Sequence, residues 1–191
     1  ERDMNILICS RTFLPNVGGI EMATHTIARA LSRLGHQVAV VTETLDRKCE
    51  PFPYAVLRRP SAGRFLAAVG RCDVSVYSNI SLRAAWPLLV VRRPWVVVHH
   101  IYLRQHPPDL TLLERMKRLA LGGARSIAIS RAVARDLALP AAIIPNSYRD
   151  DLFRITNTGM REWDLAFLGR LVPEKGAALL LSALGRLRSR G

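Results

Sequence analysis

Short apolar runs alternate with amphipathic segments along most of the chain. The first run, residues 4–9, is apolar at almost every position, which is typical of a strand buried on both faces of a sheet. Apolar residues then recur at helical spacing from Ile20 to Leu34, and Gly35 follows as a residue type that commonly ends a helix. Residues 37–42 form a second apolar run. This order predicts one strand–helix–strand unit.

The same alternation continues to about residue 147. Further strands are predicted at 55–57, 73–77, 95–98, 126–129 and 141–144, and helices at 65–69, 81–89, 112–121 and 131–137. Ser130 has the residue type and the position of an N-cap for the last of these helices. Strands that alternate with helices pair in parallel, because each helix carries the chain back along the sheet. We therefore predict an α/β fold, a Rossmann-like parallel sheet with helices on both faces.

The pattern restarts after a polar stretch. Residues 148–163 lack a hydrophobic period and are predicted to be a linker between a first domain, 1–147, and a second domain that begins at residue 164. The predicted elements of the second domain are a strand, a loop and a helix, at 164–168, 169–176 and 177–187. One strand and one helix cannot enclose a core. We therefore expect residues 164–191 to be the start of a truncated second βαβ domain.

The charge of the chain limits the classes of partner. The 191 residues include 28 basic and 15 acidic side chains, and the formal net charge is +13. The cations are spread along the chain and no aromatic RNA-binding motif occurs, so nucleic acid is not the expected partner. The charge favours peripheral contact with an anionic membrane surface. A basic surface that is merely solvated is the open alternative.

Two further features concern the compartment. The longest apolar stretch, 84–91, is far shorter than the roughly 20 residues of a membrane-spanning helix, and the N-terminus lacks the pattern of a signal peptide. The cysteines Cys9, Cys49 and Cys72 form no CxxC pair and no zinc pattern, which is typical of reduced thiols. We expect a cytoplasmic protein, at most peripheral on the inner face of the membrane.

Two loops between a strand and a helix have the composition of phosphate sites. In the first, Gly18 and Gly19 precede a helix, so the backbone and its free N–H groups could approach an anion closely; a plain structural turn is the alternative. In the second, Arg170 offers a bidentate fork and Lys175 a compact point charge to a phosphate. The alternative there is two solvated cations, one of them paired with Glu174.

Two adjacent histidines follow the predicted strand at 95–98. Ligands bind at the carboxyl edge of open α/β sheets, and a histidine at that edge could form a hydrogen bond with a sugar hydroxyl. Neighbouring side chains on a strand point to opposite faces, so only one of His99 and His100 is expected to meet a ligand. The alternative is a histidine that only caps the sheet edge. The sequence contains no nucleophilic serine with a base, no metal cluster and no P-loop.

Taken together, these segments resemble the family 4 glycosyltransferases, retaining enzymes with two facing Rossmann-like domains, the GT-B fold. The resemblance covers nearly the whole chain, and its most specific part is a GR…EKG element. It rests on residues 6–42 with the loop PNVGGIE, on 126–130 and 144–147 with Phe153, and on 167–176. Ser147 departs from the glycine that is usual in the family after Pro-Asn.

The resemblance implies roles for individual residues. Arg170 and Lys175 would neutralise the diphosphate of a nucleotide sugar, and His99 would lie near the transferred sugar; these three are the expected catalytic residues. The residues expected to bind the donor are Gly18, Gly19, Asn146, Arg170, Glu174 and Lys175. The family's paired glutamates would lie beyond Gly191, so the fragment alone is expected to be inactive.

The implied activity is transfer of a sugar, with retention, from a nucleotide diphosphate sugar to a hydroxyl acceptor. The expected acceptor is a cell-envelope or lipid-linked glycan, in polysaccharide biosynthesis, with the acceptor held by the first domain. Neither a cofactor nor a metal is expected. The rival hypothesis is a non-catalytic module that uses the same basic loops to bind phosphate, a nucleotide or nucleic acid.

Overall fold

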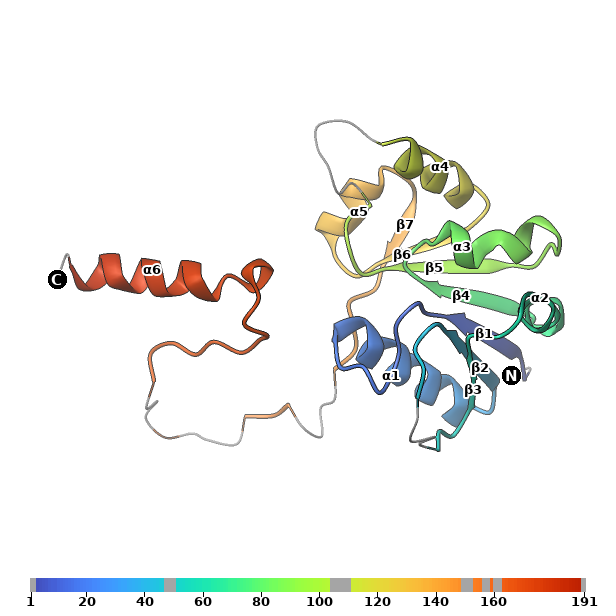
Figure 1. Cartoon of the computed structure of the whole chain (residues 1–191), viewed down its shortest axis with the longest axis horizontal. Coiled ribbons are helices and arrows are strands. Elements are labelled where there is room, and N and C mark those ends of the chain that lie inside the picture. Colours follow the sequence, from blue (N-terminus) through green and yellow to red (C-terminus); the bar gives the residue numbers. More distant parts are fainter. Residues whose placement is uncertain are drawn as a thin grey trace. The chain divides into compact units, whose positions relative to one another are not determined.

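The computed structural model describes most of the chain in two compact units, Glu1–Tyr148 and Arg149–Gly191 (Figure 1). The described residues are 3–46, 51–103, 111–148, 153–155, 159 and 163–189. The first unit contains a parallel sheet, and the longest element in the described part of the second unit is a helix.

The first unit is built on one seven-stranded sheet in the order β3-β2-β1-β4-β5-β6-β7, and every neighbouring pair of strands is parallel. The strands are β1 (Asn5–Cys9), β2 (Gln37–Thr42), β3 (Ala55–Arg58), β4 (Val74–Ser78), β5 (Trp95–His99), β6 (Arg125–Ala128) and β7 (Ala141–Ile143). The predicted Rossmann-like parallel sheet is therefore confirmed, and each predicted strand of this unit lies within one or two residues of its observed position.

Helices connect most of these strands, and β2 is followed by β3 without a helix in the described residues between them. The helices are α1 (Gly19–Arg33), α2 (Ala62–Arg71), α3 (Leu82–Ala85) with the 3₁₀ turn η1 (Trp86–Leu89), α4 (Leu112–Leu121) and α5 (Arg131–Leu137). The Oγ atom of Ser130 accepts a hydrogen bond from the Val133 N–H at 3.2 Å, so it caps α5 as predicted. Gly35 follows the end of α1 with a φ of +91°, a conformation that only glycine adopts without strain. Within the described ranges of both units, no helix is long and apolar enough to cross a membrane.

The core lies on both faces of the sheet, because the side chains of β1 alternate between them. Ile6 and Ile8 pack in one buried cluster with Ala28 of α1. Leu7 and Cys9 belong to a second cluster, to which α2 contributes Phe65 and Val69. Helices therefore cover both faces, and the polar groups at the carboxyl ends of the strands are left along one edge of the sheet.

The second unit differs from the sequence-based expectation in one element. Residues 164–168, predicted to be a strand, carry no strand assignment. A strand exists only when its N–H and C=O groups pair with a neighbouring strand, and none is paired with this segment in the described part of the unit. The loop and the helix do form, as the 3₁₀ turn η2 (Pro173–Lys175) and the helix α6 (Ala177–Arg188).

Candidate functional site

The order of the strands creates a switch point beside β1. The chain passes from β1 to β2 and β3 on one side, and then returns to place β4 on the other side of β1. The loops that leave β1 and β4 therefore run in opposite directions and open a crevice at the carboxyl edge of the sheet. Ligands of open α/β sheets bind in such crevices.

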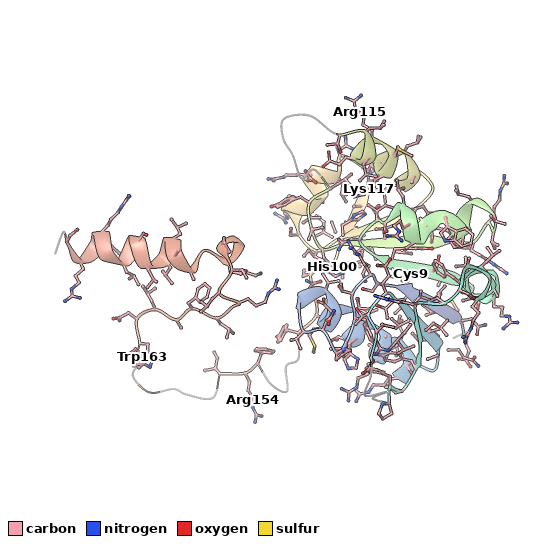
Figure 2. The ribbon with its side chains drawn as sticks, viewed as in Figure 1. Cys9, His100, Arg115, Lys117, Arg154 and Trp163 are labelled. Atoms are coloured by element: carbon pink, nitrogen blue, oxygen red, sulfur yellow. The ribbon has the colours of Figure 1, made fainter. Side chains whose placement is uncertain are left out.

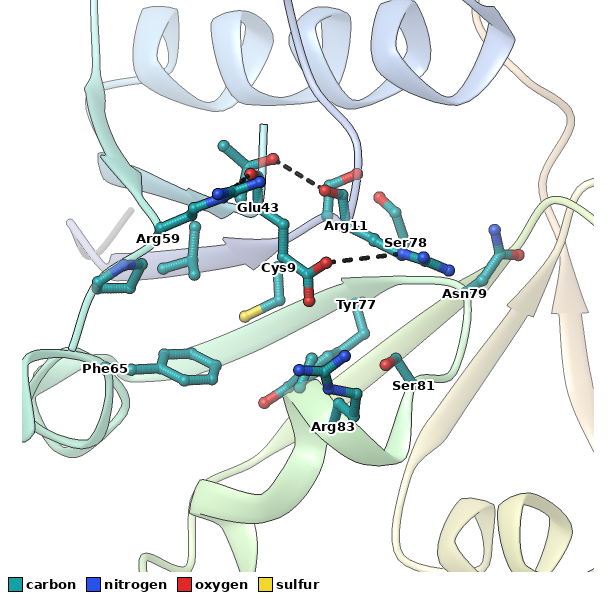
Figure 3. A pocket seen from close by; sticks show the side chains of 15 residues that line it. Cys9, Arg11, Glu43, Arg59, Phe65, Tyr77, Ser78, Asn79, Ser81 and Arg83 are labelled. Carbon is teal, nitrogen blue, oxygen red and sulfur yellow. Dashed lines mark hydrogen bonds and ion pairs between the residues drawn. The ribbon is translucent and has the colours of Figure 1, made fainter. Parts of the chain in front are cut away.

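Two adjoining hollows, which we call the switch-point cleft, lie at this edge. Figure 3 shows the smaller one. The smaller has a volume of about 180 Å³ and is floored by Cys9, Phe65 and Tyr77. The larger has a volume of about 630 Å³ and extends to Leu113 and Lys117 of α4. Both hollows are lined by the loops that follow β1 and β4, through the shared residues Ser10, Arg11, Ser78, Asn79, Ser81 and Arg83.

The cleft carries an excess of positive charge. Arg11, Arg59 and Arg83 line the smaller hollow, and Lys117 lines the larger one. Figure 2 shows Lys117 on α4. The one carboxylate among the lining residues is that of Glu43, whose Oε2 atom lies 3.7 Å from Nε of Arg11 in an exposed ion pair. Four cations and one carboxylate at a concave surface concentrate anions from solution.

Buried hydroxyl groups hold the two sides of the switch point together beneath the cleft. Oγ1 of Thr24, in α1, lies 2.9 Å from Oγ of Ser78 at the end of β4 and 3.4 Å from Oγ of Ser10 after β1. Thr24 is fully buried, so these hydrogen bonds are shielded from competing water. The helix α1 is thereby fixed to both strands that flank the switch point.

Two cleft residues adopt a left-handed backbone conformation without being glycine. Arg59 has a φ of +43° and Asn79 a φ of +64°. The N–H of Arg59 donates to the carbonyl of Thr42 at 2.8 Å, and the N–H of Asn79 donates to that of Val98 at 2.8 Å. Asparagine tolerates this conformation, but for arginine it costs on the order of 1–2 kcal/mol. Backbone strain of this kind is concentrated at functional sites.

The glycine loop occupies the place that the sequence predicted. Gly18 is the N-cap of α1, with extended backbone and without a side-chain cap, and Gly19 is the first helical residue. A Cβ atom on Gly18 would overlap Oε2 of Glu21, whereas Gly19 has open space beside it. The carboxylate of Glu21 therefore folds back over the start of the helix, where it complements the helix dipole.

His99, the predicted catalytic histidine, is buried at the end of β5. Its side chain is 2% exposed, and its Nε2 atom lies 3.3 Å from Oγ of Ser126. Burial, and secondarily the neighbouring His100, lower the pKa of His99 to about 4. The ring is therefore neutral at pH 7 and can exchange hydrogen bonds, but it cannot serve as a proton donor of ordinary strength. It also borders a small hollow of about 20 Å³ beside Lys117.

His100 lies at the same edge of the sheet, as Figure 2 shows. Its backbone N–H donates to Oδ1 of Asn79 at 2.8 Å. Burial lowers its pKa, and the nearby side chain of Asn146 opposes part of that shift. No atom within the described ranges satisfies the full geometry of a hydrogen bond with either of its buried ring nitrogens, so the approach of Asn146 is a weak contact. The predicted donor residue Asn146 thus lies beside His100.

The second predicted phosphate loop has the form of a turn that leads into a helix. The N–H of Lys175 donates to Val172 O at 3.0 Å, and Gly176 takes a φ of +74° at the N-cap of α6. Arg170 and Lys175 are exposed, and neither forms a side-chain hydrogen bond or ion pair with another residue that the structure describes. The side chain of Glu174 lies outside the described residues, and its predicted pairing with a loop cation stays a prediction.

The two thiols that the structure describes in the first unit are shielded from solvent. Cys9 and Cys72 are buried and free, and burial raises the pKa of Cys9 to about 12 and that of Cys72 above its usual value. Cys49 lies outside the described residues. The described ranges also contain no group of three or more His, Cys, Asp or Glu side chains arranged to hold a metal ion.

Sequence reasoning did not identify the cations of the cleft. Arg11 and Arg59 follow the carboxyl ends of β1 and β3 within two residues, and Arg83 lies in the short helix after β4. Their common signal is a basic residue just after a predicted strand in a parallel sheet. That signal identifies the edge of the sheet, but the strand order is needed to bring these residues to one cleft.

Comparison with known proteins supports the fold. No protein-family model matches the chain, and no curated protein matches its sequence. Among solved structures it is similar to a glycosyltransferase from Rickettsia africae ESF-5, with a TM-score of 0.56 and 12% identity over 76% of this chain and 43% of that one. At this identity the similarity shows a shared Rossmann-like fold.

Two further structures match with lower scores. An α-glucosyltransferase in complex with UDP and a 13-mer DNA has a TM-score of 0.40 and 16% identity, over 75% of this chain and 37% of that one. A D-isomer specific 2-hydroxyacid dehydrogenase family protein from Klebsiella pneumoniae 342 has a TM-score of 0.42 and 13% identity, over 74% and 44%. This chain spans less than half the length of each of the three proteins.

Proposed function

We propose that the chain contains the acceptor-binding domain of a retaining glycosyltransferase, followed by the beginning of its donor domain. The enzyme would transfer a sugar from a nucleotide diphosphate sugar to a hydroxyl group of a cell-envelope or lipid-linked glycan. The observation that carries the proposal is the open cleft at the switch point of a Rossmann-like sheet whose fold is shared with a known glycosyltransferase. The two exposed cations of the loop before α6 supply a complementary anion site in the second unit.

Arg170 and Lys175 would act on the leaving group. Charge builds up on the nucleotide diphosphate as the bond to the sugar breaks, so a cation that contacts it stabilises the transition state more than the bound donor. The left-handed Gly176 turns the chain into α6 directly after Lys175, so the helix N-terminus adds free N–H groups next to the lysine.

The first unit would supply the remaining contacts. Open space beside Gly19 would allow a phosphate or sugar to approach the first residue of α1, while the carboxylate of Glu21 lies beside Gly18. His99, held neutral by burial, would exchange a hydrogen bond with the transferred sugar rather than a proton. The acceptor hydroxyl would be presented from the switch-point cleft, where loops from several strands surround one hollow.

The test is a transfer assay with the product of the complete gene. We expect release of a nucleoside diphosphate from one of a panel of nucleotide sugars, and a glycoside with retained anomeric configuration by NMR. Arg170→Ala and Lys175→Ala should each cost about 2–4 kcal/mol in kcat/KM, mostly through kcat. Arg186→Ala, which removes an equally exposed cation from the last turn of α6, is the matched control and should leave kcat unchanged.

Three results would contradict the proposal. An inverted product would refute the retaining mechanism, and unchanged kcat in both loop variants would refute the assigned diphosphate site. Nucleotide binding without cleavage of any donor in the panel would favour the non-catalytic binding module.

A further inference from the structure

The cations of the switch-point cleft come from separate elements and converge on its two adjoining hollows. Arg11 follows β1, Arg59 follows β3, Arg83 lies in α3 and Lys117 in α4. Figure 3 shows Arg11, Arg59 and Arg83 around the smaller hollow. Convergence from four elements differs from a charged face of a single helix, where like charges gather only because they are neighbours in sequence.

These cations have few partners of their own. Arg83 and Lys117 form no side-chain hydrogen bond or ion pair with any other residue within the described ranges. Arg59 uses Nε to donate to the backbone carbonyl of Glu43 at 2.8 Å, which leaves its terminal amino groups available. Arg11 forms an exposed ion pair with the carboxylate of Glu43, in which Nε lies 3.7 Å from Oε2. The cleft therefore presents positively charged hydrogen-bond donors that other described residues do not occupy.

The backbone at Arg59 is an independent observation that points to the same cleft. Glycine would adopt the φ of +43° without strain, yet the position carries an arginine whose N–H and Nε both form hydrogen bonds. The side chain is thus held in place at a conformational cost. An arginine that served only to keep the surface soluble could stand at a position without this backbone strain.

We propose that the switch-point cleft binds an anionic group, a phosphate or a carboxylate, on the acceptor substrate. This inference rests on the proposed function, because it is that function which makes the cleft an acceptor site. Arg83 lines both hollows and contacts the anion, while Lys117 approaches it from the larger hollow and Arg59 from the smaller one. The hydroxyl group of Ser81, which also lines both hollows, offers a neutral donor. Ile20, Ile101 and Leu113 line the larger hollow and accommodate an apolar portion beside the anion.

Anion binding is tested on the 191-residue chain alone, without a donor. The probe is inorganic phosphate, titrated at low ionic strength while NMR follows the arginine Nε–H and backbone signals of the cleft. We expect Arg83→Gln and Lys117→Gln to weaken phosphate binding about three- to tenfold each, because each removes one charge-assisted donor that is partly screened by water. Arg71→Gln is the matched control: Arg71 is exposed in the last turn of α2 and lies at a different hollow, beside Asn5 and Gln37.

The Arg59→Gly variant distinguishes a role of Arg59 in phosphate binding from a role in the stability of the fold. Glycine relieves the left-handed strain, so the melting temperature should stay level or rise, while phosphate binding should weaken. Phosphate affinity that is equal in the parent chain, both glutamine variants and Arg59→Gly would overturn the proposal, as would the absence of any binding at low ionic strength.

The source of the anion is distinguished by two further probes. Saturable binding of glycerol 3-phosphate but not glycerol, lost in Arg83→Gln, indicates a free phosphorylated acceptor. Binding to phosphatidylglycerol vesicles but not phosphatidylcholine vesicles, with the same dependence on Arg83, indicates a lipid headgroup. A chain that binds these probes in the predicted way while the complete gene product transfers no sugar would refute the proposed function and leave the anion site standing.

Discussion

Burial of His99 couples the stability of the sheet to pH. Its folded-state pKa of about 4 lies below the ordinary value of 6.5, because the ring is out of contact with water. The unfolded chain therefore binds a proton between pH 6.5 and 4 that the folded chain does not bind, and stability falls as the pH falls through this range. The loss is about 3 kcal/mol when complete. His100 has a pKa lowered in the same direction and adds to the effect.

His99→Asn should reduce this dependence. Asparagine does not titrate, so the free energy of unfolding, measured with urea at pH 7 and at pH 4.5, should change less in the variant than in the parent chain. Carboxylates titrate in both proteins, and the difference between the two slopes isolates the histidine. Parallel slopes would show that His99 is accessible to protons in the folded state.

For individual residues, the sequence predicted the position in the fold better than the burial of the side chain and its neighbours. It placed His99 at the carboxyl end of a strand, which the structure confirms, but an isolated strand pattern cannot tell a buried imidazole from an open one. Burial depends on β6, whose Ser126 lies against the ring, and that pairing is not encoded near residue 99. Arg59 and Arg83 were missed for the same reason, since their meeting depends on β2 and β4 flanking β1.

Individual elements are fixed by local signals that can be tested. Ser130 accepts the hydrogen bond that caps α5, so Ser130→Ala should lower the free energy of unfolding by about 1 kcal/mol, and Ser130→Asp should retain most of the stability. Ser81 is the matched control, because it stands at the N-cap of α3 without a side-chain capping bond. Chemical denaturation of the three variants is the measurement, and equal losses in Ser130→Ala and Ser81→Ala would contradict the capping role.

The elements predicted correctly are those whose cause is local. Gly35 and Ser130 delimit helices through their own backbone or side chain, and both appear as predicted. The segment 164–168 has the composition of a strand but not the paired structure, because pairing needs a neighbour that a sequence pattern cannot supply. Strand propensity is thus a weaker predictor of a strand than a capping residue is of a helix end.

At the scale of the whole molecule, the buried core belongs to the first unit. Both buried clusters are built from residues between Ile6 and Leu137. In the second unit α6 has no buried residue, and Leu179 and Leu181 are 76% and 69% exposed. A chain that ends at Tyr148 should therefore fold alone and melt at the temperature of the first unit in the 191-residue chain, as measured by calorimetry. Loss of cooperative melting in the shorter chain would show that the division at this residue is not a domain boundary.

The pairing of β1 with β4 joins two parts of the sheet that are each continuous in sequence. Strands β1 to β3 come from residues 5–58, and strands β4 to β7 from residues 74–143, so pairing within each part closes shorter loops, at a smaller entropy cost, than the pairing of β1 with β4. During synthesis the first part can assemble on the ribosome before the second has emerged. The switch-point cleft spans this seam, so it comes into existence only when the halves dock. A chain in which β1 and β4 have not paired therefore lacks the site proposed for the anion, and phosphate binding would report on whether the two parts of the sheet are joined.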